Sequence, residues 1–231
     1  MLKAVNLSKK YSGQEALKGI NLDVQPGEVF CLLGANGAGK STTIRIFLNF
    51  TRPSGGAAYV NQLDVQVYPE ESKRHLAYIP EIVLLYPALT GLENLAFFSR
   101  LAGFDYERQQ LEAYLRAAGL QPEAMDKRLE TYSKGMRQKV GIAIATAKKA
   151  GALIMDEPTS GLDPRAIEEF SRQVKQYAGG GGAVLMATHD IFNAVTIGTH
   201  IGIMKQGRLV HTLRSADINA SDLQKLYLET I

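Results

Sequence analysis

The sequence lacks the features of a membrane-spanning, disulfide-rich or nucleic-acid-binding protein. Its single cysteine, Cys31, lies within the apolar run VFCLL, so no disulfide framework is available and a reducing compartment is indicated. No apolar stretch approaches the ~20 residues that span a bilayer, and the N-terminus MLKAVNLSKK lacks the apolar core of a signal peptide. The net charge is only +3, and no run of Lys and Arg is dense enough to indicate nucleic acid binding. These absences predict a soluble cytoplasmic chain, with any membrane span supplied by another chain.

Hydrophobic residues make up 45% of the 231 residues, enough to bury a sizeable core. Short apolar runs rich in β-branched residues predict strands at 20–24, 28–33, 57–60, 76–79, 152–156, 183–187 and 200–204. Three of these runs are continuously apolar, which is typical of strands buried on both faces of a parallel sheet. Strands of this kind, separated by helical segments, predict an α/β fold.

The helical segments are recognised by apolar spacing and by start and stop signals. Thr90 and Glu93 form a capping-box pattern that opens a helix through about Leu101. A second helix is expected around 111–118 and a third over 165–178. Residues 88–130 contain helices and no convincing strand.

We therefore expect a single domain over 1–231. Its α/β core would comprise 1–87 and 131–231, and 88–130 would be a helical insertion.

The stretch GANGAGKS, residues 34–41, fits the phosphate-loop pattern G-x-x-x-x-G-K-[ST]. A predicted strand precedes it and a helical run follows, which is the expected context. Glycines allow backbone N–H groups to close around phosphate oxygens, Lys40 would neutralise phosphate charge, and the Ser41 hydroxyl would hold Mg²⁺. The alternative is an ordinary glycine-rich turn. The residues expected to contact nucleotide here are Gly34, Asn36, Gly37, Ala38, Gly39, Lys40, Ser41 and Thr42.

A pair of carboxylates, Asp156 and Glu157, ends the predicted strand ALIMD. An Asp at this end of a strand beside a phosphate loop is placed to bind Mg²⁺. Because side chains alternate along a strand, we expect Glu157 to point the other way and to deprotonate a water molecule. The alternative is a solvated acidic pair at a strand end.

A second serine–glycine stretch, TYSKGMRQK at 131–139, offers helix-start N–H groups to an anion although the chain already has a phosphate loop. The order of motifs GANGAGKST, YSKGMRQK, LIMDEPTSGLDP and THD resembles the nucleotide-binding subunit of ATP-binding cassette (ABC) transporters. The resemblance extends from LSKKYSGQEALKGINLDVQPGEVFCLLGANGAGKST to about MKQGRLV. It implies a P-loop NTPase core with a mainly parallel sheet, an N-terminal antiparallel β part and a helical insertion.

The resemblance also implies roles for single residues. Two subunits of the family pack head to tail around two ATP molecules, so Ser133 and Gly135 would contact the ATP held by the other subunit. A plain helix N-cap at Ser133 is compatible with that role. Tyr11 would stack on adenine, or is a surface tyrosine in a turn. His189 would hydrogen-bond the γ-phosphate and orient the attacking water. Asp163 would organise the subunit interface, or cap the helix that begins with Pro164.

The sequence departs from the family pattern at a few positions. The usual signature Leu-Ser-Gly-Gly-Gln here has Lys134 in place of the first glycine and Met136 in place of glutamine. In YIPE, Glu81 stands where most members place glutamine, and it retains an oxygen for Mg²⁺. Together with the segment YIPEIVLLYPALTGLENLAFFSRLAG, these features look like the subfamily that works with ABC-2-type permeases.

The resemblance implies an ATPase that binds ATP and Mg²⁺, dimerises with an identical or different cassette and powers an integral-membrane permease, for export. That permease would hold it at the inner face of the cell membrane. No nucleic acid is expected among its partners. One alternative is a soluble ABC ATPase of DNA repair or translation, which the short spacing between motifs and the single cassette disfavour. Another is a non-catalytic nucleotide-binding regulatory subunit. A third is an importer subunit, of which the short C-terminus disfavours the sugar-importer type.

Overall fold

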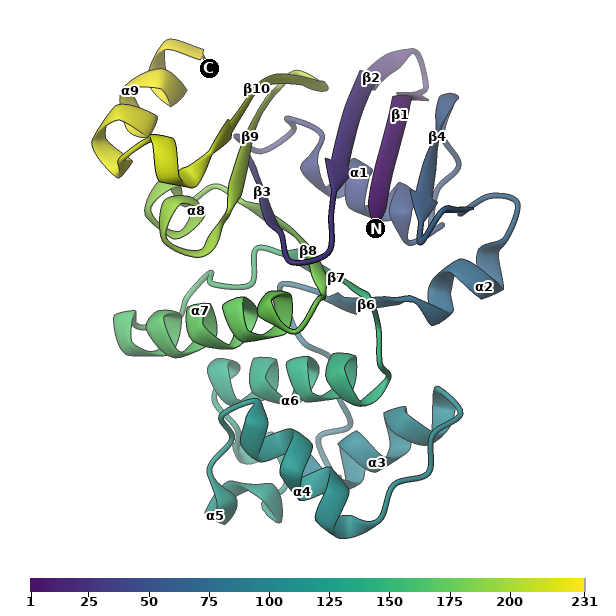
Figure 1. The fold of residues 1–231 in the computed structure, drawn as a ribbon, viewed down its shortest axis with the longest axis vertical. Coiled ribbons are helices and arrows are strands. Elements are labelled where there is room, and N and C mark those ends of the chain that lie inside the picture. Colours follow the sequence, from purple (N-terminus) through teal and green to yellow (C-terminus); the bar gives the residue numbers. More distant parts are fainter. Residues whose placement is uncertain (231) are drawn as a thin grey trace.

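The structure, a computed structural model, describes residues 1–230. A six-stranded sheet lies between helices on one side and a small antiparallel sheet on the other (Figure 1). The strand order of the larger sheet is β10-β9-β3-β8-β7-β6, and all neighbours are parallel except β9 and β10. Its strands are β3 (Val29–Leu33), β6 (Leu76–Ile79), β7 (Ala152–Asp156), β8 (Ala183–Thr188), β9 (His200–Lys205) and β10 (Arg208–Arg214).

The second sheet has four antiparallel strands in the order β2-β1-β4-β5. They are β1 (Leu2–Tyr11), β2 (Gln14–Val24), β4 (Gly55–Val60) and β5 (Leu63–Asp64). The β1–β2 connection consists of Ser12 and Gly13, both with positive φ (44° and 90°), as the right-handed twist of a two-residue hairpin requires. This hairpin places Tyr11 on the same side of the molecule as the phosphate-loop residues 34–41.

Nine α-helices are assigned within residues 1–230. They are α1 (Lys40–Phe47), α2 (Pro69–Arg74), α3 (Gly91–Leu101), α4 (Arg108–Ala117), α5 (Pro122–Met125), α6 (Lys134–Ala147), α7 (Pro164–Gly179), α8 (Ile191–Ile197) and α9 (Ala220–Thr230). Helices α3 to α5 lie together beyond α6, at the far end of the molecule from the antiparallel sheet (Figure 1). Short 3₁₀ turns occur at Leu129–Thr131 and Ser215–Asp217.

The large sheet separates two hydrophobic cores, and alternate side chains of each strand enter different cores. On β3, Cys31 and Leu33 pack with the helices of the α3–α7 side, whereas Phe30 and Leu32 pack with α1 and the antiparallel sheet. All four side chains are at most 3% exposed. The continuous apolarity of this strand in the sequence therefore reflects burial on both faces.

The strands predicted from the sequence are all present, with small changes at their ends. The capping box at Thr90 is confirmed: its side chain accepts from the backbone N–H of Glu93, whose carboxylate accepts from the N–H of Thr90. The strands β1, β5 and β10 are absent from the predicted set. In β10 the exposed and half-buried residues alternate, so it has no continuous apolar run to reveal it. In residues 1–230 no helix has the length and apolarity needed to cross a membrane.

Candidate active site

The phosphate loop connects β3 to α1 and depends on glycine at its last position. Gly39 is the N-cap of α1 with φ 111°, a conformation that side-chain-bearing residues rarely adopt. A Cβ there would also lie 2.8 Å from Cδ2 of Leu17 and 2.9 Å from the carbonyl oxygen of Ala16. The chain can thus turn sharply into α1, whose N-terminal N–H groups and dipole favour an anion.

The ammonium of Lys40 is held inside this loop. The side chain is only 6% exposed, and Nζ donates to the carbonyl oxygen of Gly34 at 2.5 Å. Nζ also lies 3.5 Å from Oε1 of Glu157. A buried cation is tolerated only when it is paired and hydrogen-bonded, and these contacts meet that requirement. The fixed positive charge is therefore placed between the phosphate loop and a carboxylate.

Asp156 ends β7 next to the first turn of α1. Burial raises the pKa of its carboxyl, and the neighbouring Ser41 side chain opposes that shift. Glu157 and Glu81 also raise this pKa because they are negative, and Lys40 lowers it. Asp156 and Ser41 are therefore neighbours, as the motifs predict.

The oxygen atoms of Ser41 and Asp156 suit the hard ion Mg²⁺, with Glu81 beside them. Within residues 1–230 no cluster of three or more His, Cys, Asp or Glu side chains is arranged to hold a metal. Mg²⁺ in nucleotide sites is commonly held by one or two carboxylates together with substrate phosphates, so this smaller donor set fits the ion.

Glu157 does not follow the alternation expected from the sequence. The strand ends at Asp156, and Glu157 has φ 45°, in the left-handed region. Its carboxylate therefore turns into the same cavity as Asp156 instead of pointing away from it. Oε2 lies 2.8 Å from Nδ1 of His189 and also accepts the backbone N–H of His189 at 3.3 Å. The expectation of opposite directions was wrong because a turn begins at Glu157.

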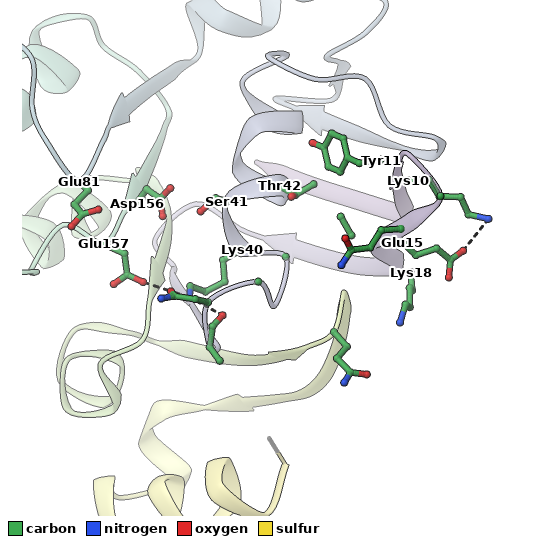
Figure 2. A pocket seen from close by; sticks show the side chains of 18 residues that line it. Lys10, Tyr11, Glu15, Lys18, Lys40, Ser41, Thr42, Glu81, Asp156 and Glu157 are labelled. Carbon is green, nitrogen blue, oxygen red and sulfur yellow. Dashed lines mark hydrogen bonds and ion pairs between the residues drawn. The ribbon is translucent and has the colours of Figure 1, made fainter.

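These side chains line a cavity of about 930 Å³, large enough for a nucleotide (Figure 2). Figure 2 shows Glu81, Asp156 and Glu157 at one side, the β1–β2 hairpin at the other, and Lys40 and Ser41 between them. Of the residues predicted from the sequence, the cavity is lined by Tyr11, Asn36, Gly37, Gly39, Lys40, Ser41, Thr42, Glu81, Asp156 and Glu157.

Other predicted residues do not line this cavity. Gly34 contributes the carbonyl that holds Lys40, and the buried Ala38 accepts the N–H of Gly207 at 2.9 Å. His189 contacts the cavity only through Glu157, and its side chain is 63% exposed.

Ser133, Gly135 and Asp163 line a separate groove of about 160 Å³ between α6 and α7. Ser133 is the N-cap of α6 and accepts the N–H of Met136 at 3.3 Å. Asp163 is the N-cap of α7 and accepts the N–H of Ala166 at 2.9 Å, with Pro164 in the first helical position. Both residues thus have the capping role that the sequence offered as an alternative or compatible role.

Sequence reasoning missed eight residues that line the cavity, seven of them outside the motifs and one, Ala35, within the phosphate loop. They are Lys10, Gly13, Gln14, Glu15, Ala16, Lys18, Ala35 and Gln206. Most belong to the β1–β2 hairpin, whose turn signal Ser12-Gly13 was available in the sequence. Gln206 lies in the β9–β10 turn, and the bond from Gly207 to Ala38 ties that turn to the phosphate loop. The Gln-Gly turn was also visible, but its position beside the loop is set by strand order.

The sequence profile of the ABC transporter family matches residues 17–160, more than half of the chain. The chain therefore belongs to the ABC transporter family and is an ABC-type ATPase. The daunorubicin/doxorubicin resistance ATP-binding protein DrrA of Streptomyces peucetius is 35% identical over 93% of this chain and 66% of its own length. The bacitracin transport ATP-binding protein BcrA of Bacillus licheniformis is 31% identical over 92% of this chain and 69% of its own length. The chain thus spans about two thirds of the length of these curated relatives.

Solved structures agree with this assignment. An ATP-binding subunit of an ABC transporter superposes with a TM-score of 0.83 at 32% identity, covering 99% of this chain and 98% of that chain. A dimeric ATP-binding cassette in a post-hydrolysis state with ADP and Pi superposes with a TM-score of 0.79 at 27% identity, covering 93% of this chain and 99% of that chain. The fold is that of an ABC ATPase cassette.

Proposed function

We propose that this chain is the ATPase subunit of an ABC exporter. It binds ATP with Mg²⁺ and pairs head to tail with a second cassette around two ATP molecules. Its hydrolysis of ATP drives a separate integral-membrane permease from the inner face of the membrane. The observation that carries the proposal is the convergence of Lys40, Ser41, Asp156 and Glu157 on one nucleotide-sized cavity.

The chemistry assigned to this chain is mainly positioning and charge compensation. Lys40 and the N–H groups at the start of α1 compensate the negative charge of the phosphates. Glu157 accepts a proton from the attacking water, and His189 is within hydrogen-bond distance of the Glu157 carboxylate, so it can orient that group. Ser41 and Asp156 would hold Mg²⁺, which neutralises phosphate charge when bound, with Glu81 alongside.

The proposed pairing rests on Ser133 and Gly135. Ser133 is exposed, and it lies at the N-terminus of a 14-residue helix, outside the cavity of its own chain. A hydroxyl and helix-start N–H groups suit the γ-phosphate of an ATP bound by a facing subunit. A dimeric cassette among the similar structures supports this arrangement. Asp163 would then lie at the subunit interface near the same groove.

The proposed contact with the permease rests on an apolar groove of about 410 Å³ between the sheet and the helical insertion. Its lining includes Phe50, Leu84 and Leu101, which are 70%, 82% and 75% exposed. Exposed apolar side chains gathered in one groove are typical of a protein–protein contact. Among the relatives, the names of drug-resistance and Nod factor export proteins support export.

The direct test uses the Glu157→Gln variant. It should bind ATP as tightly as the wild type and release almost no phosphate, because it lacks the base and keeps Ser41 and Asp156. With saturating MgATP it should accumulate as a dimer by light scattering. A Glu157→Gln protein that hydrolyses ATP at the wild-type rate, or stays monomeric with ATP, contradicts the proposal.

Substitutions of Ser133 in that background separate capping from contact with the partner subunit. Ser133→Arg should give a monomer with near-normal ATP affinity, because the long side chain holds the two surfaces apart. Ser133→Asp keeps a strong N-cap, so its unfolding temperature should stay near that of the parent. Its negative charge should nevertheless repel the facing phosphate and prevent dimerisation. Dimers in both variants would exclude Ser133 from the interface, and loss of monomer affinity would place it in the site of its own chain.

A further inference from the structure

The loop that follows Glu157 is held by two side chains from the start of α6. Nζ of Lys134 donates to the carbonyl oxygen of Ser160 at 2.5 Å, and Nε2 of Gln138 donates to the carbonyl oxygen of Pro158. Lys134 and Gln138 are four residues apart, so they project from the same face of the helix. Residues 158–160 are thus fastened to the helix whose N-cap is Ser133.

The same loop is fastened on its other side to the start of α8. Oγ1 of Thr159 accepts from Nδ2 of Asn193 at 3.0 Å, and Asn193 is itself held by Asp190 at 2.8 Å. His189, which precedes Asp190, contacts the carboxylate of Glu157. The loop therefore connects the N-terminus of α6 with the Glu157–His189 pair.

The contact of Gln138 is not explained by stability alone. Its side chain is 0% exposed, and its Oε1 has no hydrogen-bond partner among residues 1–230. Leaving a buried amide oxygen without a partner costs stability, and an apolar side chain of similar size would avoid that cost. The side-chain amide of Gln138 makes one hydrogen bond, to the carbonyl oxygen of Pro158, the residue that directly follows Glu157. Lys134 adds a bond in which the donor carries a full charge, which is stronger than a neutral one.

We propose that Lys134 is a positioning residue that links the two nucleotide sites of the dimer. The proposal rests on the proposed function, in which Ser133 serves the ATP of the partner and Glu157 serves the ATP of its own chain. Lys134 adjoins Ser133 in sequence and holds the loop that begins after Glu157. Docking of Ser133 on one ATP is therefore transmitted to the carboxylate at the other.

A different role for Lys134 gives different kinetics. If its ammonium met the phosphate of the facing ATP, its loss would weaken ATP-driven dimerisation and raise the KM for ATP. A positioning role predicts that binding and dimerisation persist while turnover and cooperativity fall, because Glu157 is then misplaced in the assembled dimer.

The experiment compares wild type, Lys134→Ala, Lys134→Arg and the control Lys175→Ala, which removes an equal charge from the exposed face of α7. In Lys134→Ala we expect kcat to fall roughly tenfold, since small misplacements in an active site have effects of this size or larger. We expect KM to stay near the wild-type value and the Hill coefficient for ATP to fall toward that of independent sites. Lys134→Arg, which keeps a charged donor, should restore most of the turnover.

Three results would overturn the proposal. One is unchanged kcat and cooperativity in Lys134→Ala, which shows that the bond to Ser160 has no consequence. Another is a raised KM with loss of the dimer in the Glu157→Gln background, which assigns Lys134 to the phosphate. The third is a variant that only lowers the unfolding temperature, with the Hill coefficient kept.

Two further measurements keep the test decisive. If Lys134→Ala does not fold, Lys134→Gln and Gln138→Met are measured in the same way, and unchanged cooperativity in both contradicts the proposal. If Lys134 and Gln138 act on the same loop, the free-energy effects of the two single substitutions on turnover should not add in the double variant. Failure of the proposed function is recognised separately, because Glu157→Gln with Lys134 intact would then not dimerise with ATP.

Discussion

Nζ of Lys40 lies 3.5 Å from Oε1 of Glu157, inside a loop whose carbonyl oxygens also hold the ammonium. The cation that compensates phosphate charge and the carboxylate assigned to proton transfer are therefore neighbours within one chain. Oε2 of the same carboxylate contacts His189, so Glu157 is held from both sides. Removing any one of Lys40, Glu157 or His189 should therefore change the position or electrostatic environment of the other two.

Lys40→Ala should weaken MgATP binding about 10- to 100-fold, since a charge-assisted hydrogen bond contributes about 1.5–3 kcal/mol. The variant also leaves the Glu157 carboxylate without its nearby cation. Titration calorimetry measures the affinity, and Lys175→Ala, on exposed α7, is the charge-matched control. Equal affinity in wild type and Lys40→Ala would falsify the assignment of Lys40 to the phosphates.

Asp156→Asn should make the stability of the nucleotide-free protein less dependent on pH. Burial raises the pKa of Asp156 in the folded state, so the folded chain binds this proton more tightly than the unfolded chain does. The contribution of Asp156 to stability is thus fully present below its unfolded pKa and is lost as the pH rises through the raised folded pKa.

Asp156→Asn should therefore have a higher unfolding temperature than wild type at pH 7. The difference should shrink as the pH falls below the raised pKa of Asp156. Thermal unfolding without nucleotide or Mg²⁺ at several pH values is the measurement. A variant that is less stable than wild type at pH 7, with a gap that closes on acidification, has the wrong sign and contradicts the raised pKa.

Glu81→Gln should leave ATP affinity near the wild-type value and increase the rate of hydrolysis. Glu81 lines the cavity and adds to the negative charge around Asp156. The substitution removes that charge and places an amide donor beside the expected position of the γ-phosphate. Steady-state phosphate release at saturating Mg²⁺ is the assay, and a rate equal to wild type would show that Glu81 does not reach the phosphate.

Tyr11→Ala should weaken ATP binding by about fivefold or more, because stacking of an aromatic side chain on a base contributes about 1–3 kcal/mol. Tyr11 ends β1 at the edge of the cavity, is 41% exposed, and has Nζ of Lys9 4.7 Å from its ring centroid. Tyr11→Phe keeps the ring and should keep the affinity. Tyr68→Ala, a comparably exposed tyrosine outside the cavity, is the control. Equal losses in Tyr11→Ala and Tyr68→Ala would exclude stacking at Tyr11.

The sequence predicts the parts of the site that depend on local backbone requirements. The glycines of the phosphate loop, the helix start at Lys40 and the strand ending in Asp156 follow from spacing, because each needs only a few adjacent residues. The turn at Glu157 was not predicted, since a glutamate with positive φ is uncommon and carries no sequence signal. Gly207 could not be placed beside Ala38 without the order of the strands, because the two are distant in sequence.

The same limit applies to the fold. Strands β3, β7 and β8 are recognised because both of their faces are buried, so their apolar runs are unbroken. Strand β1 carries polar residues such as Lys9 and Lys10 on a partly exposed sheet, and its pattern is that of a half-solvated strand. The contacts of Lys134 and Gln138 with 158–160 join residues 20 or more apart, which no local pattern encodes.

Because alternate residues of β3 face different cores, a substitution in this one strand can weaken the packing of either core. A temperature-sensitive substitution at Cys31 would disturb the core formed with the insertion helices. One at Phe30 would disturb the core formed with the antiparallel sheet. Either would loosen the strand from which the phosphate loop begins at Gly34. Temperature-sensitive alleles isolated far from the nucleotide should therefore share one biochemical phenotype, a lowered affinity for ATP that returns on cooling.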